Sequence, residues 1–311
     1  MEPGAQRPRW KTLLAFAIIY FVWGSTFLAI RIGVHELPPL LFAAMRFFAA
    51  GIILFAWTLT HGERLPVRRQ WASILLLAFL IFVIDYGLLF WAEQRVPSGI
   101  AAVMMATIPL FTALSEILFL RTQRLTVRLV AALLIGLCGV AVLVIRSFNI
   151  GGQPIQPIGA LALIAGSLSW SVASVLTRKL PLPASKIMSS GSQMLAGGIM
   201  LTVAAAGFGE FRGFDPLKIS AGAWFALLYL IVAGSIIGFT AYLWLIHHES
   251  PTKVGTYAYV NPVVAVILGY LIGGEALGPR TILGTLFVLI SVVVITTTRA
   301  KKQVPAGQAK V

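Results

Sequence analysis

Three ionisable side chains lie inside long apolar stretches of this sequence: Arg46, Asp85 and Glu116. A charge at membrane depth is costly and marks a proton or substrate path, or a pair with another charge. If segments 38–60 and 71–93 cross a membrane in opposite directions, Arg46 and Asp85 lie equally far from the centre, by about 4.5 Å. We therefore predict an ion pair between them. Three interpretations are open. The pair is a static structural contact, or the two residues are functional, with Asp85 taking up a proton or Arg46 holding a substrate carboxylate. In the third, helix rotation keeps the two residues apart.

Glu116 lies towards the end of segment 98–120, next to a loop that carries Arg121 and Arg124. Opposite charges this close in sequence predict an anchoring contact between Glu116 and the loop. Proton coupling through Glu116 is the alternative.

A second group of residues has the types expected of a ligand pocket: aromatic rings, small polar groups and adaptable apolar side chains. Trp23 and Trp170 fall near the middle of their segments, away from the interfacial depth where Trp concentrates. The predicted pocket residues are Trp23, Ser25, Met104, Trp170, Tyr257, Tyr259 and Asn261. Helix packing is the alternative, because Gly and Ser beside the tryptophans also let helices approach closely.

Pro109 and Pro262 fall in the middle of two apolar segments. A proline inside a helix removes a backbone hydrogen bond and frees a carbonyl. Broken helices at matching positions in two halves of a chain indicate a binding site or a hinge. A plain packing kink is the other interpretation.

Catalytic and metal-binding patterns are missing from the sequence. The four histidines, His35, His61, His247 and His248, fall in loops or at the ends of apolar segments, and no His/Cys/Asp/Glu spacing suggests a metal. There is no H-E-x-x-H motif and no pair of aspartates within the apolar segments. We therefore expect no enzyme activity, no metal and no cofactor.

The composition decides which elements must position these residues. Of 311 residues, 59% are hydrophobic and 11% charged, against roughly 45–50% and 25% in soluble proteins. A water-soluble surface cannot be built from this mixture. The net charge of +14 does not predict nucleic-acid binding, because the Lys and Arg residues lie in short loops and form no stripe.

Ten apolar segments are long enough to cross a bilayer, which takes about 20 residues. The predicted fold is an all-α integral membrane protein of ten transmembrane helices. The segments are 12–34, 38–60, 71–93, 98–120, 127–146, 157–178, 185–207, 221–246, 252–273 and 280–298.

The loops on alternate sides differ in basic charge. The side that carries both termini holds 17 Lys and Arg, and the other side holds 6. Because cytoplasmic loops are enriched in Lys and Arg, both termini are predicted to be cytoplasmic.

The sequence also contains an internal repeat. A shift of 147 residues pairs Trp23 with Trp170, and a shift of 153 pairs Pro109 with Pro262. We predict a five-helix repeat over residues 1–148, a second over 157–298 and a cytoplasmic tail over 299–311. Since five is odd, the two copies cross the membrane in opposite directions, as in transporters built from inverted repeats.

Four motifs occur in order along these segments: Trp23–Phe27, Met45–Ala49, Pro97–Ala102 and Tyr257–Pro262. Together they resemble the EamA family of the drug/metabolite transporter superfamily, over about residues 12 to 298. Members often carry a Gly-Glu pair after the fourth and ninth helices. Gly274-Glu275 fits this pattern, whereas Thr122-Gln123 stands at the first position.

The resemblance implies a secondary transporter, usually an exporter of amino acids, other metabolites or drugs, in a prokaryotic inner membrane. With the inverted repeat, it predicts alternating access around a small-molecule substrate between the halves, with proton coupling through Asp85 or Glu116. A membrane-embedded interaction or sensor protein that transports nothing is the alternative. Monomer and homodimer both remain open, and the substrate is not determined.

Overall fold

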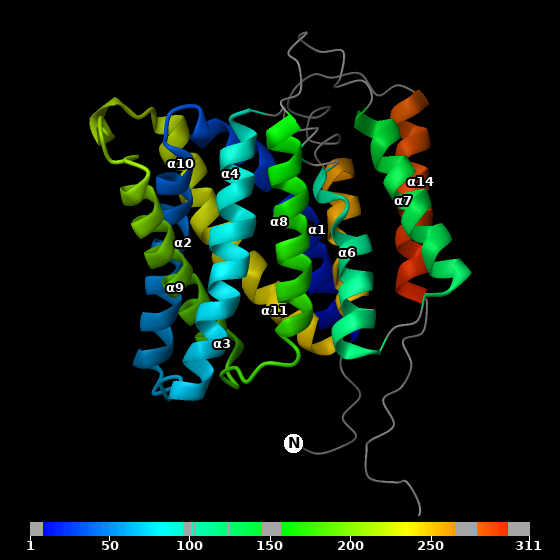
Figure 1. The fold of residues 1–311 in the computed structure, drawn as a ribbon, viewed down its shortest axis with the longest axis horizontal. Helices are drawn as coiled ribbons and strands as arrows, with labels where there is room; N and C mark the ends of the chain where they lie inside the picture. The colour runs from blue at the N-terminus through cyan, green and yellow to red at the C-terminus, as the bar shows by residue number, and fades with distance from the viewer. Residues whose placement is uncertain are drawn as a thin grey trace, which may run out of the picture.

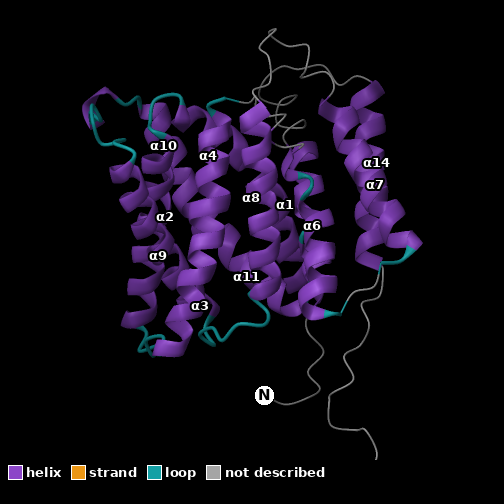
Figure 2. Cartoon of the chain, in the orientation of Figure 1, coloured by secondary structure: helices purple, strands orange, loops and turns teal. Residues whose placement is uncertain are grey.

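The computed structural model describes residues 9–95, 101, 104–122, 125–144, 157–264 and 279–297. Within these ranges every regular element is helical, as Figure 2 shows by its purple ribbons. The helices run roughly side by side in one bundle, with the start of α1 at the bottom of Figure 1. The expected all-α class is confirmed for this part of the chain.

Six helices in the described ranges are long and apolar enough to cross a membrane. Each coincides with a predicted segment to within about three residues. They are Arg9–Val34 (α1), Pro39–Thr60 (α2), Arg68–Glu93 (α3, η1 and α4), Pro157–Leu176 (α8), Lys186–Gly207 (α9) and Ala221–His248 (α10, η5 and α11).

The other predicted segments are described in part. They contain α6 (Ile108–Ser115) continuing into η2 (Glu116–Leu120), α7 (Val127–Val144), α12 (Pro251–Val254), the helical residues 257–264 and α14 (Pro279–Thr297). The predicted tail, Gly274-Glu275 and most of Pro97–Ala102 lie outside the described residues.

Two of the long helices contain an eight-residue stretch of π-helix at their centre. These stretches are η1 (Phe79–Tyr86) and η5 (Leu230–Ile237). The flanking α-helices are α3 (Arg68–Ala78) and α4 (Gly87–Glu93), and α10 (Ala221–Tyr229) and α11 (Gly238–His248). A π-helix is rare and occurs mostly at functional sites, because the wider turn changes which side chains face a neighbour. No feature of the hydropathy pattern predicted either stretch.

Glycines bring α2 and α9 into backbone contact. A Cβ added to Gly198 would lie 2.5 Å from the Phe48 nitrogen, and one added to Gly191 would lie 2.8 Å from the Phe55 nitrogen. Lipid tails give helices no hydrophobic reason to associate, so close backbone packing over small residues supplies the attraction. The two helices therefore form a tight pair at one side of the bundle (Figure 1).

A second tight pair, α7 with α14, lies at the opposite side of Figure 1. The Ser291 hydroxyl donates to the Ala132 carbonyl at 2.6 Å. A Cβ on Gly139 would lie 2.9 Å from the Gly284 carbonyl oxygen, so this contact also depends on small residues. The α1, α8 and α11 helices fill the space between the two pairs (Figure 1).

Candidate functional site

A cavity lies between α1, η1, α8 and the helical residues 257–264. The space in it that the centre of a water molecule can occupy is about 40 Å³. Aromatic and aliphatic side chains form most of its wall, with a few polar groups among them. Its lining residues are Trp23, Thr26, Phe27, Ile30, Asp85, Tyr86, Leu89, Met105, Trp170, Tyr257 and Asn261.

The aromatic wall is built around Trp23. Its ring centroid lies 5.5 Å from that of Trp170 and 4.8 Å from that of Tyr257, with interplanar angles of 82° and 80°. Such edge-to-face contacts are the arrangement aromatic rings favour. The Trp23 indole donates to the Gly234 carbonyl in η5 at 3.0 Å, which fixes the ring. Trp23 and Trp170, paired by the sequence repeat, thus meet at the centre of the molecule.

Asp85, in η1, lines this cavity and is 2% exposed. Its Oδ1 has no hydrogen-bond partner among the residues that the structure describes, and none of them forms an ion pair with it. A Cβ added to Gly166 of α8 would lie 3.1 Å from this oxygen, so the carboxylate rests against the α8 backbone. A buried carboxylate without donors is costly and points to a group that is supplied from elsewhere.

The predicted ion pair between Arg46 and Asp85 is wrong for the described structure. Arg46 is buried, donates from Nε to the Ser235 hydroxyl in η5 at 2.8 Å, and lies over the rings of Phe47 and Tyr86 at 4.7 and 5.1 Å. The sequence places the two residues at the same depth in the membrane. In the structure, however, each helix is rotated about its axis so that Arg46 faces η5 and Asp85 faces α8. The guanidinium is held by cation–π contacts and a hydroxyl.

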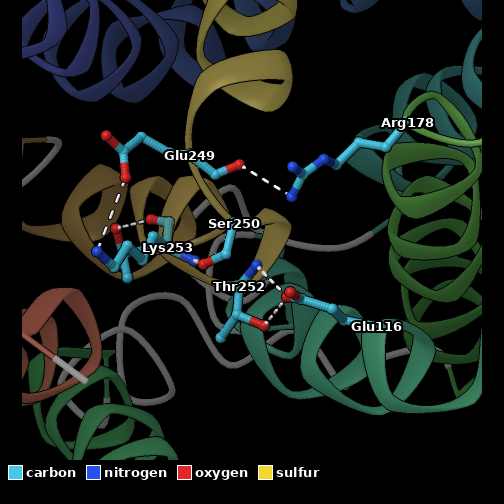
Figure 3. Close-up of polar contacts among 7 residues, drawn as sticks. Glu116, Arg178, Glu249, Ser250, Thr252 and Lys253 are labelled. Atoms are coloured by element: carbon cyan, nitrogen blue, oxygen red, sulfur yellow. Dashed lines mark hydrogen bonds and ion pairs between the residues drawn. The ribbon is translucent and has the colours of Figure 1, made fainter. Parts of the chain in front are cut away.

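Glu116 is fully buried and its carboxylate is well supplied with donors (Figure 3). Oε2 accepts from the Thr252 backbone nitrogen at 3.1 Å and from its hydroxyl at 2.7 Å, and Oε1 accepts from the Thr122 hydroxyl at 2.9 Å. The predicted contact between Glu116 and the following loop is therefore present, but it is made by Thr122. No ion pair joins Glu116 to Arg121 in the described residues, and Arg124 is not described.

The segment around Thr252 is tied down further. Lys253 forms an ion pair with Glu249 at 3.7 Å, and Arg178 at the end of α8 donates to the Glu249 carbonyl at 3.4 Å (Figure 3). The Ser250 hydroxyl accepts from the Lys253 nitrogen at the start of α12. Glu116 thus belongs to a polar network at the end of the bundle where α8 ends, separate from the cavity.

Four of the predicted pocket residues, Trp23, Trp170, Tyr257 and Asn261, line the cavity. The other three lie elsewhere. Ser25 contacts the Tyr229 hydroxyl at 2.5 Å, and Tyr259 donates to the Leu133 carbonyl in α7 at 2.9 Å.

The third is Met104, whose neighbour Met105 lines the cavity instead. One residue along a helix rotates a side chain by about 100°, which explains each of these displacements.

The two prolines differ in their surroundings. Pro109 sits in the first turn of α6, directly after a turn at 106–107, where its missing N–H removes no helical hydrogen bond. The predicted loss of a mid-helix bond is therefore wrong for Pro109. Pro262 lies within the helical residues 257–264, after a turn at 255–256. The break in each helix precedes its proline, and a hinge role stays a prediction.

Glu93, in α4, was not predicted as a buried charge. It is 2% exposed, and neither of its carboxylate oxygens has a hydrogen-bond partner in the part of the chain that the structure describes. Its position directly after the apolar run Leu88–Ala92, within the predicted segment 71–93, could have revealed it. Tyr86 was also missed, although it follows Asp85 directly and lines the same cavity.

Two glutamates link the halves of the chain at the other end of the bundle. Glu36, after α1, accepts from the Ser220 nitrogen and hydroxyl, both at 2.7 Å, and these bonds lower the pKa of Glu36 below its usual value. Glu210, after α9, accepts from the Leu41 nitrogen at 2.7 Å, but burial outweighs this bond and raises the pKa of Glu210. Each carboxylate thus caps a helix of the other half.

Among the described residues, no group of three or more His, Cys, Asp or Glu side chains could hold a metal ion. The cavity instead offers aromatic rings with two oxygen acceptors, those of Asp85 and Asn261. Such a wall suits binding of a small organic molecule.

Comparison with known families decides the broad class. Residues 10–145 and 157–297 each match the model of the EamA-like transporter family. The chain belongs to this family. The resemblance found in the four motifs is thereby confirmed, and membership of this family indicates a membrane transporter rather than an enzyme.

Relatives in this family support the same class. The chain is 40% identical over 285 residues to the inner membrane transporter YedA of Escherichia coli K12, covering 91% of this chain and 89% of YedA. It is 28% identical to the protein PecM of Dickeya dadantii, over 93% of this chain and 94% of PecM. A crystal structure with 24% identity superposes with a TM-score of 0.73, over 92% of this chain and 97% of the other, which shows a shared fold.

Proposed function

We propose that this EamA-family protein is a secondary carrier that moves a small organic molecule through the cavity by alternating access. The observation that carries the proposal is the position of that cavity. It lies between α1 and η1 of the first half and α8 and residues 257–264 of the second, with the unpartnered Asp85 in its wall. A site between two halves is reached from either side when the halves rock against each other.

The same proposal includes ten transmembrane helices in two inverted five-helix repeats, with both termini in the cytoplasm of a prokaryotic cell. It is supported by the twofold match to one family model. It is further supported by the π-helical stretches η1 and η5, which occupy the centre of comparable helices. The excess of Lys and Arg on the terminal side supports the orientation.

Alternating access requires contacts at each end of the bundle that can open. Glu36 with Ser220 and Glu210 with Leu41 join the halves at one end. Glu116 with Thr252 joins them at the other. Hydrogen bonds to a carboxylate contribute about 1.5–3 kcal/mol each, which is small enough for a few of them to break and re-form during a cycle.

Asp85 is the candidate for proton coupling. Glu116 already has three donors, whereas Asp85 has none from the described residues and lines the cavity. An export cycle follows in which substrate leaves as Asp85 receives a proton from the outer side.

The test is efflux from liposomes that contain the purified protein and a mixed pool of amino acids, amines and hydrophobic drugs. Each solute is measured with and without an imposed pH gradient, against liposomes that lack protein. Saturable efflux of some members, accelerated by the gradient, is the expected result. Efflux that ignores the gradient overturns proton coupling, and the same loss from both kinds of liposome overturns the carrier.

A further inference from the structure

Two acceptor oxygens in the central cavity lack a donor. Oδ1 of Asp85 and Oδ1 of Asn261 are buried, belong to residues that are 2% and 4% exposed, and have no hydrogen-bond partner among the described residues. Both residues line the same cavity. Buried hydrogen-bond acceptors are nearly always paired with a donor. Two unpaired acceptor oxygens in the same cavity therefore indicate that a bound molecule supplies the donors.

Two donors of the cavity wall, on Trp23 and Thr26, are already used. The Trp23 indole donates to the Gly234 carbonyl at 3.0 Å, and the Thr26 hydroxyl donates to the Trp23 carbonyl at 2.7 Å. Arg46 directs its Nε to Ser235 and does not line the cavity. An occupant that brings its own N–H groups and a positive charge would supply donors to both oxygens and match the charge of Asp85.

The aromatic wall favours the same charge. Trp23, Trp170 and Tyr257 are buried and meet at nearly right angles, so rings face the cavity in more than one plane. The face of an aromatic ring attracts a cation, and desolvation strengthens this attraction. The aromatic rings and the Asp85 carboxylate together therefore favour an organic cation that also has an apolar group.

A carboxylate on the same molecule would have no charged partner, because none of the described lining residues is cationic. Arg46 does not line the cavity; its guanidinium lies over the rings of Phe47 and Tyr86, and its Nη1 has no hydrogen-bond partner among the described residues. Burial of an unpaired anion beside Asp85 would be strongly unfavourable.

We propose that the cavity binds a hydrophobic primary amine without a carboxylate, whose ammonium group donates hydrogen bonds to Asp85 and Asn261. The inference names the substrate class of the carrier proposed above and rests on it for transport, though not for binding. The ammonium lies between the two oxygens, and the apolar part of the amine lies against Trp23, Trp170 and Tyr257.

Calorimetry on the unmodified protein in lipid nanodiscs at pH 7 tests the ligand class. The probe is phenethylamine, a protonated primary amine. Three analogues each change one property: phenethyltrimethylammonium keeps the charge without N–H donors, 2-phenylethanol is neutral, and phenylalanine adds a carboxylate. We expect phenethylamine to bind at least about tenfold more tightly than each analogue. Equal binding of any analogue, or no binding of phenethylamine, overturns the proposal.

A pair of variants tests the site. Asp85→Asn should remove the preference for phenethylamine over 2-phenylethanol. Glu93→Gln is the matched control, because Glu93 is another buried carboxyl on the same continuous helix that does not line the cavity, and it should keep the preference. Loss of the preference in both variants overturns the assignment to Asp85. If Asp85→Asn does not fold, the analogue series alone decides.

Binding and transport can fail separately. Selective binding of phenethylamine without flux in liposomes keeps the amine site and removes the carrier. Saturable flux of other solutes, with no binding of phenethylamine, keeps the carrier and removes the amine site.

Discussion

Asp85 and Glu116 are both acidic side chains buried within apolar helices, yet their surroundings are opposite. Glu116 receives three hydrogen bonds, two from Thr252 and one from Thr122. Asp85 receives none from the described residues and faces a cavity. The Glu116 carboxylate connects two helices, whereas the Asp85 carboxylate is free to bind a proton or a ligand reversibly.

The difference shows how a membrane protein separates structural from functional charge. A buried charge is tolerated where donors surround it, and such a group holds elements together. Where donors are missing, the fold carries a cost that a proton or a ligand removes, and the group can drive a change between states. Opposite responses of the two residues to substitution would establish this contrast.

The largest expected effect is on transport. Asp85→Asn should lower the flux of phenethylamine in liposomes by roughly 10- to 100-fold, because charge-assisted hydrogen bonds contribute about 1.5–3 kcal/mol. Its melting temperature should stay the same or rise, since a buried carboxylate without donors is removed. A melting temperature that falls together with the flux would make Asp85 structural and erase the contrast with Glu116.

Glu116→Ala should act on stability instead. The substitution leaves the Thr252 nitrogen and hydroxyl without their acceptor, and we expect the free energy of unfolding to fall by about 2–3 kcal/mol. Denaturant titration of the purified protein measures it. A double-mutant cycle with Thr252→Val isolates the contact. Because Thr252→Val keeps the backbone N–H, additive effects of the two substitutions would show that the hydroxyl bond contributes nothing to stability.

A smaller effect is expected at Gly166, which packs against Asp85. Gly166→Ala would place a Cβ 3.1 Å from Oδ1 of Asp85, closer than ordinary van der Waals contact. Displacement of the carboxylate by a few tenths of an ångström should weaken phenethylamine binding several-fold, by about 1 kcal/mol. Gly207→Ala is the control, because no atom lies within 4 Å of its added Cβ. An equal loss of phenethylamine affinity in the two variants would show that Gly166 does not act on the binding site.

The smallest effect concerns pH and the two outer glutamates of the bundle, Glu36 and Glu210. Hydrogen bonds from Ser220 lower the pKa of Glu36, so its contribution is present above the ordinary value of 4.5 and is lost as the pH falls through the lower folded value. Burial raises the pKa of Glu210, so its contribution is present below 4.5 and is lost as the pH rises through the higher folded value.

Melting temperatures between about pH 3 and 6 measure both contributions. Glu36→Gln should reduce the fall in melting temperature as the pH is lowered. Glu210→Gln should reduce the fall in melting temperature as the pH is raised. Identical pH profiles for the two variants and the unmodified protein would remove any role of these pKa shifts in stability.

Much of the fold could be predicted from hydropathy and charge. The long apolar runs of α1, α2, α8 and α9 were located to within about three residues, because length and composition alone decide whether a helix suits a bilayer. Trp23 and Trp170 could be chosen as central residues from the repeat, and they do meet.

Only the tertiary structure decided which side chains face one another. Arg46 and Asp85 were level by sequence, but Arg46 on α2 faces Ser235 and Asp85 in η1 faces the cavity. The physical reason is that depth in a membrane follows from counting residues along a helix. Rotation about the helix axis depends on packing between segments more than a hundred residues apart.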